Sequence, residues 1–257
     1  MTNNSIGVVG GVGPYAGLDL VRKIFDQTVA SSDQEHLPVV LISHSNIIDD
    51  RTAFLLGASK KNPAQSIVEV LRHLDHAGAS VAGIPCNTAH APSILDVVKA
   101  EILRNNLSIR LVHMIEETAL VVQQTLPNVR TVGLLSTTGT AQSKVYQHAF
   151  ERRGLKIVLP SNTTQQTMVH PSIYDREYGI KARSNPVTER ARSQLLDAIR
   201  ELQQQHAEAV ILGCTEIPLA VPERSFQGTV LIDPTVTLAR ALIRDFAPEK
   251  LKPFSVE

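Results

Sequence analysis

The sequence predicts an α/β protein with parallel sheets, organised as two similar halves related by a pseudo-twofold axis. Short, continuously apolar runs alternate with longer amphipathic stretches along the 257 residues, a pattern typical of parallel strands covered by helices on both faces. The stretch "GVVGGVG" (7–13) aligns with "GLLSTTG" (133–139) at an offset of 133 − 7 = 126, and the only two cysteines differ by 214 − 86 = 128. Two landmarks at nearly the same interval indicate a duplicated domain. Such a duplication would bring Cys86 and Cys214 to opposite sides of one cleft.

The individual elements follow from local patterns. The predicted strands are 6–10, 38–43, 80–85, 131–136, 156–160, 209–213 and 229–233. Residues 64–78 carry apolar side chains at helical spacing and end in a glycine, which predicts a helix with a C-terminal cap. A longer helix is predicted over 187–205, after Pro186 and with Thr188 as its N-cap.

Composition excludes several classes of protein. The 25 basic and 25 acidic residues cancel, and aromatic residues make up 4%, which argues against a nucleic-acid or membrane partner. No secretory signal and no apolar run of about 20 residues is visible. We therefore expect a cytoplasmic protein with reduced thiols. Neither cysteine has further ligands at zinc spacing, so no metal site is predicted.

The two cysteines share one local setting, which suggests shared chemistry. Each follows a predicted strand and precedes a predicted helix, where ligands bind in α/β folds. A helix start favours thiolate over thiol, whereas apolar burial raises the thiol pKa. Two facing thiols suit two-sided proton transfer at a tetrahedral carbon, one as base and the other as acid, provided that both titrate near the working pH. That reaction needs no cofactor if polar groups disperse the charge of the transition state.

Polar residues around the cysteines are the predicted substrate contacts. The hydrogen-bonding candidates are Asn87, Thr88, Ser136, Thr137, Thr138, Thr140 and Thr215. Helix capping is an alternative role for Asn87 and Thr215. Glu216 could be an acidic residue in the first turn of a helix or could orient a substrate ammonium. We expect His90 either to support the residues that bind substrate, without touching the substrate, or to lie at the surface.

The segments "GVVGGVGPYAG", "PCNTAHA" and "GCTEIPLA", in this order and at these intervals, resemble the aspartate/glutamate racemase family, and within it the aspartate racemase branch. The resemblance covers Ile6 to about Leu242. It implies cofactor-independent racemisation of a dicarboxylic amino acid by Cys86 and Cys214, with no metal. It also implies two flavodoxin-like lobes, 1–112 plus the returning 226–257 and 113–225, with the active site in the cleft between them and usual assembly as a homodimer.

The resemblance also assigns substrate-binding residues. Arg51 in "DDRT" and Lys181 in "YGIKAR" match the basic residues that hold the side-chain carboxylate in the aspartate branch, and an ordinary solvated charge is the alternative for each. Gly11 and Pro14 of the first motif complete the predicted set. Aspartate racemases commonly have "GGMGP" followed by Ala-Thr, whereas this chain has "GGVGPYAG". Aspartate is the favoured substrate, and glutamate or a broader amino-acid range stays open.

Other functions fit the sequence less well. "GVGPYA" (11–16) fits a dinucleotide-binding motif, but the second strand lacks the acidic residue that would bind ribose. A maleate isomerase would use one cysteine as nucleophile, and a decarboxylase needs only one proton donor. A non-catalytic binding protein would not need both cysteines with their polar neighbours. No G-x-S-x-G motif supports a serine hydrolase.

Overall fold

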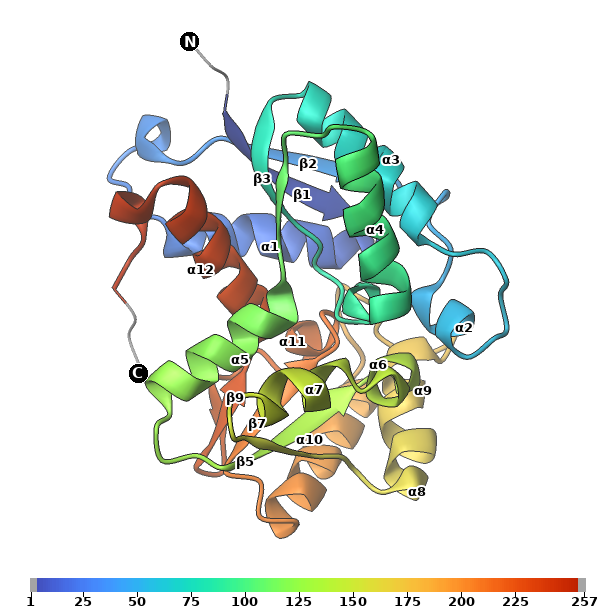
Figure 1. Ribbon diagram of the computed structural model, residues 1–257. Helices are drawn as coiled ribbons and strands as arrows, with labels where there is room; N and C mark the ends of the chain where they lie inside the picture. The colour runs from blue at the N-terminus through green and yellow to red at the C-terminus, as the bar shows by residue number, and fades with distance from the viewer. Residues whose placement is uncertain (1–3, 254–257) are drawn as a thin grey trace.

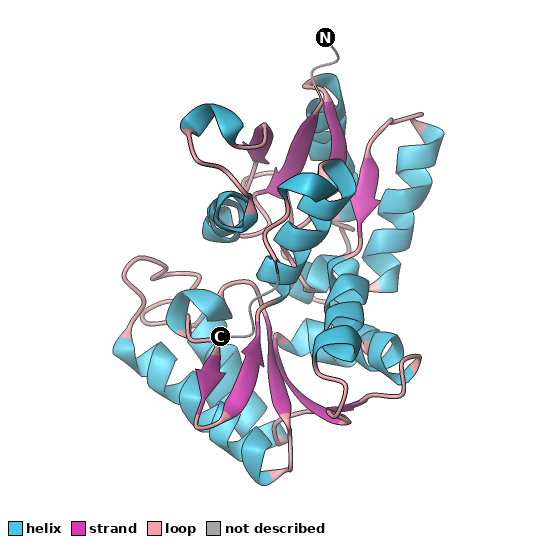
Figure 2. Ribbon diagram, turned by 90° about the vertical axis from the view of Figure 1, so that its left-hand side faces the viewer, coloured by secondary structure: helices cyan, strands magenta, loops and turns pink. Residues whose placement is uncertain are grey.

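The computed structural model describes residues 4–253 and has two α/β lobes, each built around its own sheet (Figures 1 and 2). The first sheet has the order β2-β1-β3-β4, with β1 (Ser5–Gly10), β2 (Val39–Ser43), β3 (Ala79–Gly83) and β4 (Arg110–Val112). The second has the order β6-β5-β7-β9-β8, with β5 (Thr131–Ser136), β6 (Lys156–Val158), β7 (Ala209–Gly213), β8 (Ser225–Phe226) and β9 (Thr229–Ile232). All neighbours pair in parallel except β8 with β9. The strand order repeats between lobes and is flavodoxin-like, so the predicted duplication is confirmed.

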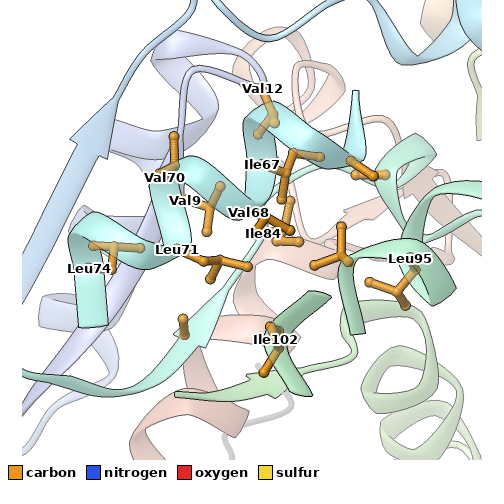
Figure 3. Packing of buried hydrophobic residues seen from close by; sticks show 14 of the residues in the cluster. Val9, Val12, Ile67, Val68, Val70, Leu71, Leu74, Ile84, Leu95 and Ile102 are labelled. Carbon is orange, nitrogen blue, oxygen red and sulfur yellow. The ribbon is translucent and has the colours of Figure 1, made fainter. Parts of the chain in front are cut away.

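Helices cover both faces of the first sheet. Helices α3 (Ala64–His76) and α4 (Pro92–Arg104) pack on one face, where Val9, Ile67, Leu71 and Ile84 share a core (Figure 3). Helices α1 (Pro14–Gln27) and α12 (Pro234–Phe246) cover the other face. Leu71 is fully buried, and truncating such a side chain to alanine costs about 2–5 kcal/mol.

The second sheet is covered in the same way. One face packs against α9 (His170–Tyr174), α10 (Glu189–Gln204) and α11 (Ile217–Ala220), and the other against α5 (Met114–Thr125) and α7 (Val145–Glu151). Short helices α2 (Arg51–Leu55), α6 (Thr138–Ser143) and α8 (Asn162–Thr164) lie in connecting segments.

Local signals explain where one predicted helix begins and where the other ends. The Thr188 side chain accepts a hydrogen bond from the Ala191 amide and caps α10 as predicted. Gly78 follows α3 with φ of +87°, a left-handed conformation that glycine adopts without steric cost.

The chain passes between the lobes twice. It first crosses after β4, and α5 begins the second lobe; it returns after β9 with α12, which packs against α1 and α5 (Figure 1). The sequence put the return at residue 226, but 225–226 and 229–232 pair with the second sheet, so the return to the first lobe begins at Pro234. Residues 1–3 and 254–257 of the predicted first lobe lie outside the described residues.

Candidate active site

Both cysteines lie directly beyond the carboxyl end of a central strand. Cys86 follows β3 and precedes a 3-10 turn at Thr88–His90, and Cys214 follows β7 and precedes α11. Both are free thiols and buried, with exposed fractions of 6% and 4%. Because β3 and β7 occupy the same place in the repeated strand order, the two thiols have equivalent positions in the two lobes.

The two cysteine turns touch each other across the lobe junction. The Thr215 hydroxyl, next to Cys214, donates a hydrogen bond to the carbonyl of Pro85, next to Cys86, at 3.1 Å. Glu216 approaches the first lobe as well, because a Cβ built on Gly13 would lie 2.6 Å from its Oε1. Gly13 also has φ of +145°, so this position requires glycine on both counts.

A pocket of about 240 Å³ opens at this junction. The first lobe contributes Gly11, Gly13, Pro14, Tyr15, Ser45, Ile48, Asp50 and Arg51, and the second contributes Lys181, Ser184 and Glu216. Five of the residues proposed from sequence therefore line one pocket: Gly11, Pro14, Arg51, Lys181 and Glu216. The pocket therefore holds two cations, Arg51 and Lys181, and two carboxylates, Asp50 and Glu216, a mixed set that suits a ligand carrying charges of both signs.

Arg51, the first residue of α2, is a buried cation in this pocket with 7% of its surface exposed. Its guanidinium donates to the Val12 carbonyl at 2.5 Å and to the Asp49 carbonyl at 3.2 Å, while its Nε is buried without a partner. Burial disfavours its charge, but the nearby Cys86 sulfur and Asp50 carboxylate outweigh this and raise the pKa of Arg51. Arg51 is therefore charged and lies beside Cys86.

Glu216 connects the second cysteine to Lys181. Its Oε1 accepts a hydrogen bond from Lys181 Nζ at 2.8 Å, and its Oε2 accepts one from Cys214 Sγ at 2.8 Å. The Glu216 carboxylate is almost fully buried, whereas a quarter of the Lys181 side chain is exposed. Burial opposes ionisation of Glu216, but Lys181 outweighs it and holds the pKa of the carboxyl below its usual range.

The same contacts act in the opposite direction on Cys214. Burial first, and the Glu216 carboxylate second, raise the pKa of the Cys214 thiol well above its ordinary value. The sequence pattern favoured a thiol that titrates near the working pH at a helix start. In the structure α11 has four residues, and burial with an adjacent carboxylate outweighs so short a helix. Cys214 is a protonated thiol.

A cluster of threonine hydroxyls lies between the lobes. Thr88 contacts Thr137 at 3.1 Å and Thr140 at 2.8 Å, and Thr137 contacts Thr140 at 3.0 Å. Thr52 of α2 joins this cluster through Thr137 at 3.3 Å. The predicted contacts Thr88, Thr137 and Thr140 are thus buried together, and sequence reasoning missed Thr52.

Asn87, Ser136 and Thr138 have different surroundings. Asn87 Oδ1 accepts a hydrogen bond from the Tyr146 hydroxyl at 2.6 Å, and its Nδ2 is buried without a partner. The Ser136 hydroxyl donates to the Thr137 carbonyl. Thr138 contacts His170 Nδ1 at 3.3 Å, away from the threonine cluster.

His90 supports the first cysteine turn from behind. Its Nδ1 contacts the Cys86 carbonyl at 2.9 Å, and its Nε2 accepts the Met114 amide at 3.2 Å. Only a neutral ring can donate from one nitrogen and accept at the other. Burial, and secondly His113, lower the pKa of His90 to about 3. His90 is 1% exposed, so it is a buried residue that supports the Cys86 turn and not a surface residue.

Two aromatic residues near the site carried no sequence signal. Tyr146 is fully buried against Asn87. The Tyr174 hydroxyl donates to Asp50 at 3.2 Å, and its ring lies 5.4 Å from Lys181 Nζ. Both tyrosines reach the site through tertiary packing, which no local motif records.

Within residues 4–253, no group of three or more His, Cys, Asp or Glu side chains could hold a metal ion. Over the same residues, every helix is too short or too polar to span a bilayer.

Duplicated α/β lobes, each with a thiol at a central strand end, together with the match to a racemase family model, identify a racemase-type isomerase. The family model of the Asp/Glu/hydantoin racemases matches residues 9–242, so the chain belongs to that family. The predicted family and fold are therefore confirmed.

Known relatives cover almost the whole chain. The structure of Picrophilus torridus aspartate racemase is 26% identical with a TM-score of 0.75, and the match covers 96% of each chain. The broad specificity amino-acid racemase RacX of Bacillus subtilis is 23% identical over 249 residues, 94% of this chain and 97% of the relative. A glutamate racemase of Levilactobacillus brevis is 26% identical over 245 residues, 93% of this chain and 77% of the relative.

Proposed function

We propose that the protein racemises a free dicarboxylic amino acid, with aspartate as the favoured substrate, by proton transfer between Cys86 and Cys214. The observation that carries the proposal is the hydrogen bond from Thr215 to Pro85, which joins the two cysteine turns beside a pocket with two cations. Neither cysteine lines this pocket itself, so the proposal requires that the α-carbon of a substrate bound there reach both thiols.

The reaction requires one thiolate and one thiol. In one direction the Cys86 thiolate removes the α-proton, and the Cys214 thiol delivers its proton to the opposite face, which inverts the carbon. The product leaves Cys86 as thiol and Cys214 as thiolate, and the reverse reaction exchanges these roles. The Arg51 guanidinium next to Cys86 balances a thiolate there, and the protonated Cys214 supplies the acid.

The pocket supports a substrate with two carboxylates. The Nε of Arg51 has no partner, while its two terminal nitrogens donate to backbone carbonyls, and Lys181 offers a partly exposed ammonium. The Asn87 Nδ2 donor and the threonine cluster are available to the α-carboxylate, on which charge grows in the transition state.

One experiment distinguishes racemisation of aspartate from racemisation of other amino acids, and racemisation from maleate isomerisation or decarboxylation. The relatives include aspartate, glutamate and broad-specificity racemases, and a maleate isomerase or decarboxylase would use the same fold differently. Purified, reduced protein is incubated in deuterated water with each enantiomer of aspartate, glutamate and alanine, and separately with maleate and a malonate. We expect aspartate to give its mirror image with deuterium at the α-carbon. Turnover of maleate or a malonate without amino-acid racemisation contradicts the proposal.

Location and assembly belong to the same proposal. Two buried free thiols suit the reducing cytoplasm. A homodimer is supported by Tyr15, Leu18 and Phe25, which lie on one face of α1 with 41%, 56% and 37% of their surfaces exposed. Apolar side chains gathered on one helix face favour contact with a second copy.

A further inference from the structure

We propose that Glu216 is a positioning residue that keeps Cys214 protonated in the resting enzyme, and that Lys181 limits how strongly it does so. The part of this role that concerns catalysis rests on the proposed racemase function. Glu216 was expected from sequence to orient a substrate ammonium or to start a helix. Its contacts assign it a task inside the enzyme itself.

The geometry gives each carboxylate oxygen one partner. Oε2 accepts from Cys214 Sγ and Oε1 accepts from Lys181 Nζ, both at 2.8 Å. Hydrogen bonds to an ionised acceptor are about twice as strong as neutral ones. If Cys214 lost its proton, two negative charges would face each other in a buried site at this distance. The carboxylate therefore disfavours the Cys214 thiolate.

The position of the carboxylate is fixed from the other lobe. Gly13 leaves no room for a Cβ, which would lie 2.6 Å from Oε1. The Thr215 hydroxyl lies 3.4 Å from Oε2 and also binds Pro85. Glu216 thus cannot move away from Cys214 without disturbing contacts between the lobes.

Several other ionisable groups lie around Cys214 and Glu216. They are Lys181 after α9, Arg51 of α2, Tyr146 of α7, Tyr174 of α9 and, bound to Tyr174, Asp50. Burial raises the pKa of both tyrosines, which are neutral. The Lys181 cation opposes Glu216 in its effect on the Cys214 sulfur and is bonded directly to Oε1. Lys181 therefore weakens the effect by which Glu216 keeps the proton on Cys214.

This arrangement makes the two thiols unequal. Cys86 lies beside the Arg51 cation, whereas Cys214 lies beside the Glu216 anion. The charges next to the two sulfur atoms therefore differ in sign, and the two halves of the site are not electrostatically equivalent.

The test is an ultraviolet titration of the Cys214 thiolate in a Cys86→Ser background, where Cys214 is the only thiol. The Cys86→Ser, Cys214→Ser protein supplies the tyrosine baseline. Glu216→Gln keeps the shape and removes the charge, so we expect its midpoint to fall by at least about one pH unit, roughly tenfold more thiolate at a fixed pH. Lys181→Met should raise the midpoint. Glu223→Gln, a nearby carboxylate bound to Arg192, should leave it unchanged.

An unchanged or higher midpoint in Glu216→Gln overturns the proposal. If that variant does not fold, Glu216→Asp decides, because its shorter side chain withdraws the carboxylate from the sulfur: a lower midpoint supports the proposal and an equal one overturns it. The titration needs no substrate, so it is independent of whether the protein racemises aspartate. With an active enzyme, the alkaline limb of kcat/KM against pH should move to lower pH in Glu216→Gln.

Discussion

Thr215 donates a hydrogen bond to the carbonyl of Pro85, and these are the residues next to Cys214 and Cys86. This contact ties the strand end of one lobe to the strand end of the other. The contact brings together two turns that lie half the chain apart in sequence. The lobe junction, rather than either lobe alone, carries the candidate chemistry.

Removing this contact should weaken both folding and activity. Thr215→Val keeps the side-chain shape and leaves the Pro85 carbonyl without this donor, so we expect the free energy of unfolding to fall by about 1–3 kcal/mol. Chemical denaturation and the kcat of racemisation measure the two effects. Thr125→Val, which removes a hydroxyl bound within α5, is the matched control. An unchanged kcat in Thr215→Val would show that racemisation does not require this hydrogen bond between the two turns.

Each cysteine should be essential for racemisation, but on a different side of the substrate. Cys86→Ser and Cys214→Ser should each lower two-way turnover by at least about 10²-fold, because one proton carrier is missing in both directions. In deuterated water, any residual α-hydrogen exchange should occur with one enantiomer in Cys86→Ser and with the other in Cys214→Ser. Near-normal racemisation by either variant contradicts the two-thiol mechanism.

Arg51 should discriminate substrates by their second carboxylate. Arg51→Lys keeps the charge but loses the planar fork, so we expect the KM for aspartate to rise about tenfold or more. Alanine has no distal carboxylate, and its KM should change less. Equal losses for aspartate and alanine would identify Arg51 as a structural residue that holds the Val12 and Asp49 carbonyls.

The stability of the protein should fall in mild acid because of His90. Burial and His113 lower its pKa to about 3 in the fold, against 6.5 for the free side chain. Below pH 6.5 the unfolded chain therefore binds a proton that the folded chain refuses, and the free energy of unfolding falls as the pH drops toward 3. Denaturation at a series of pH values measures this. His90→Gln should have a flatter profile over that range, and a profile as steep as the wild type would exclude His90 as a source.

The exposed face of α1 should set the oligomeric state. Leu18→Glu places a charge at the centre of the stripe formed with Tyr15 and Phe25, and we expect it to shift a dimer toward monomer in sedimentation or light scattering. Leu103→Glu changes another exposed leucine, on α4, and is the control. A wild-type monomer, or a Leu18→Glu dimer, would contradict assembly through α1.

Short-range pattern accounted for much of the fold. Strands β5 and β7 begin and end where the apolar runs predict, and Thr188 caps α10 as expected. The short strands β4 and β8 carried too few apolar residues to be noticed. The return point also escaped prediction, because local sequence does not show which of the two sheets the strand β9 joins.

In the candidate site too, some features follow from local sequence and others only from tertiary packing. The duplicated setting of Cys86 and Cys214, and the family to which the chain belongs, follow from the sequence alone, because strand, turn and thiol are neighbours along the chain. Only the tertiary structure assigns Glu216 to Cys214 and Lys181, brings Tyr146 to Asn87 and packs Thr52 with Thr137. Charge and burial act through space over a few ångströms. The pKa of the Cys214 thiol is therefore set by burial and by contacts with Glu216 and Lys181 that form only in the fold.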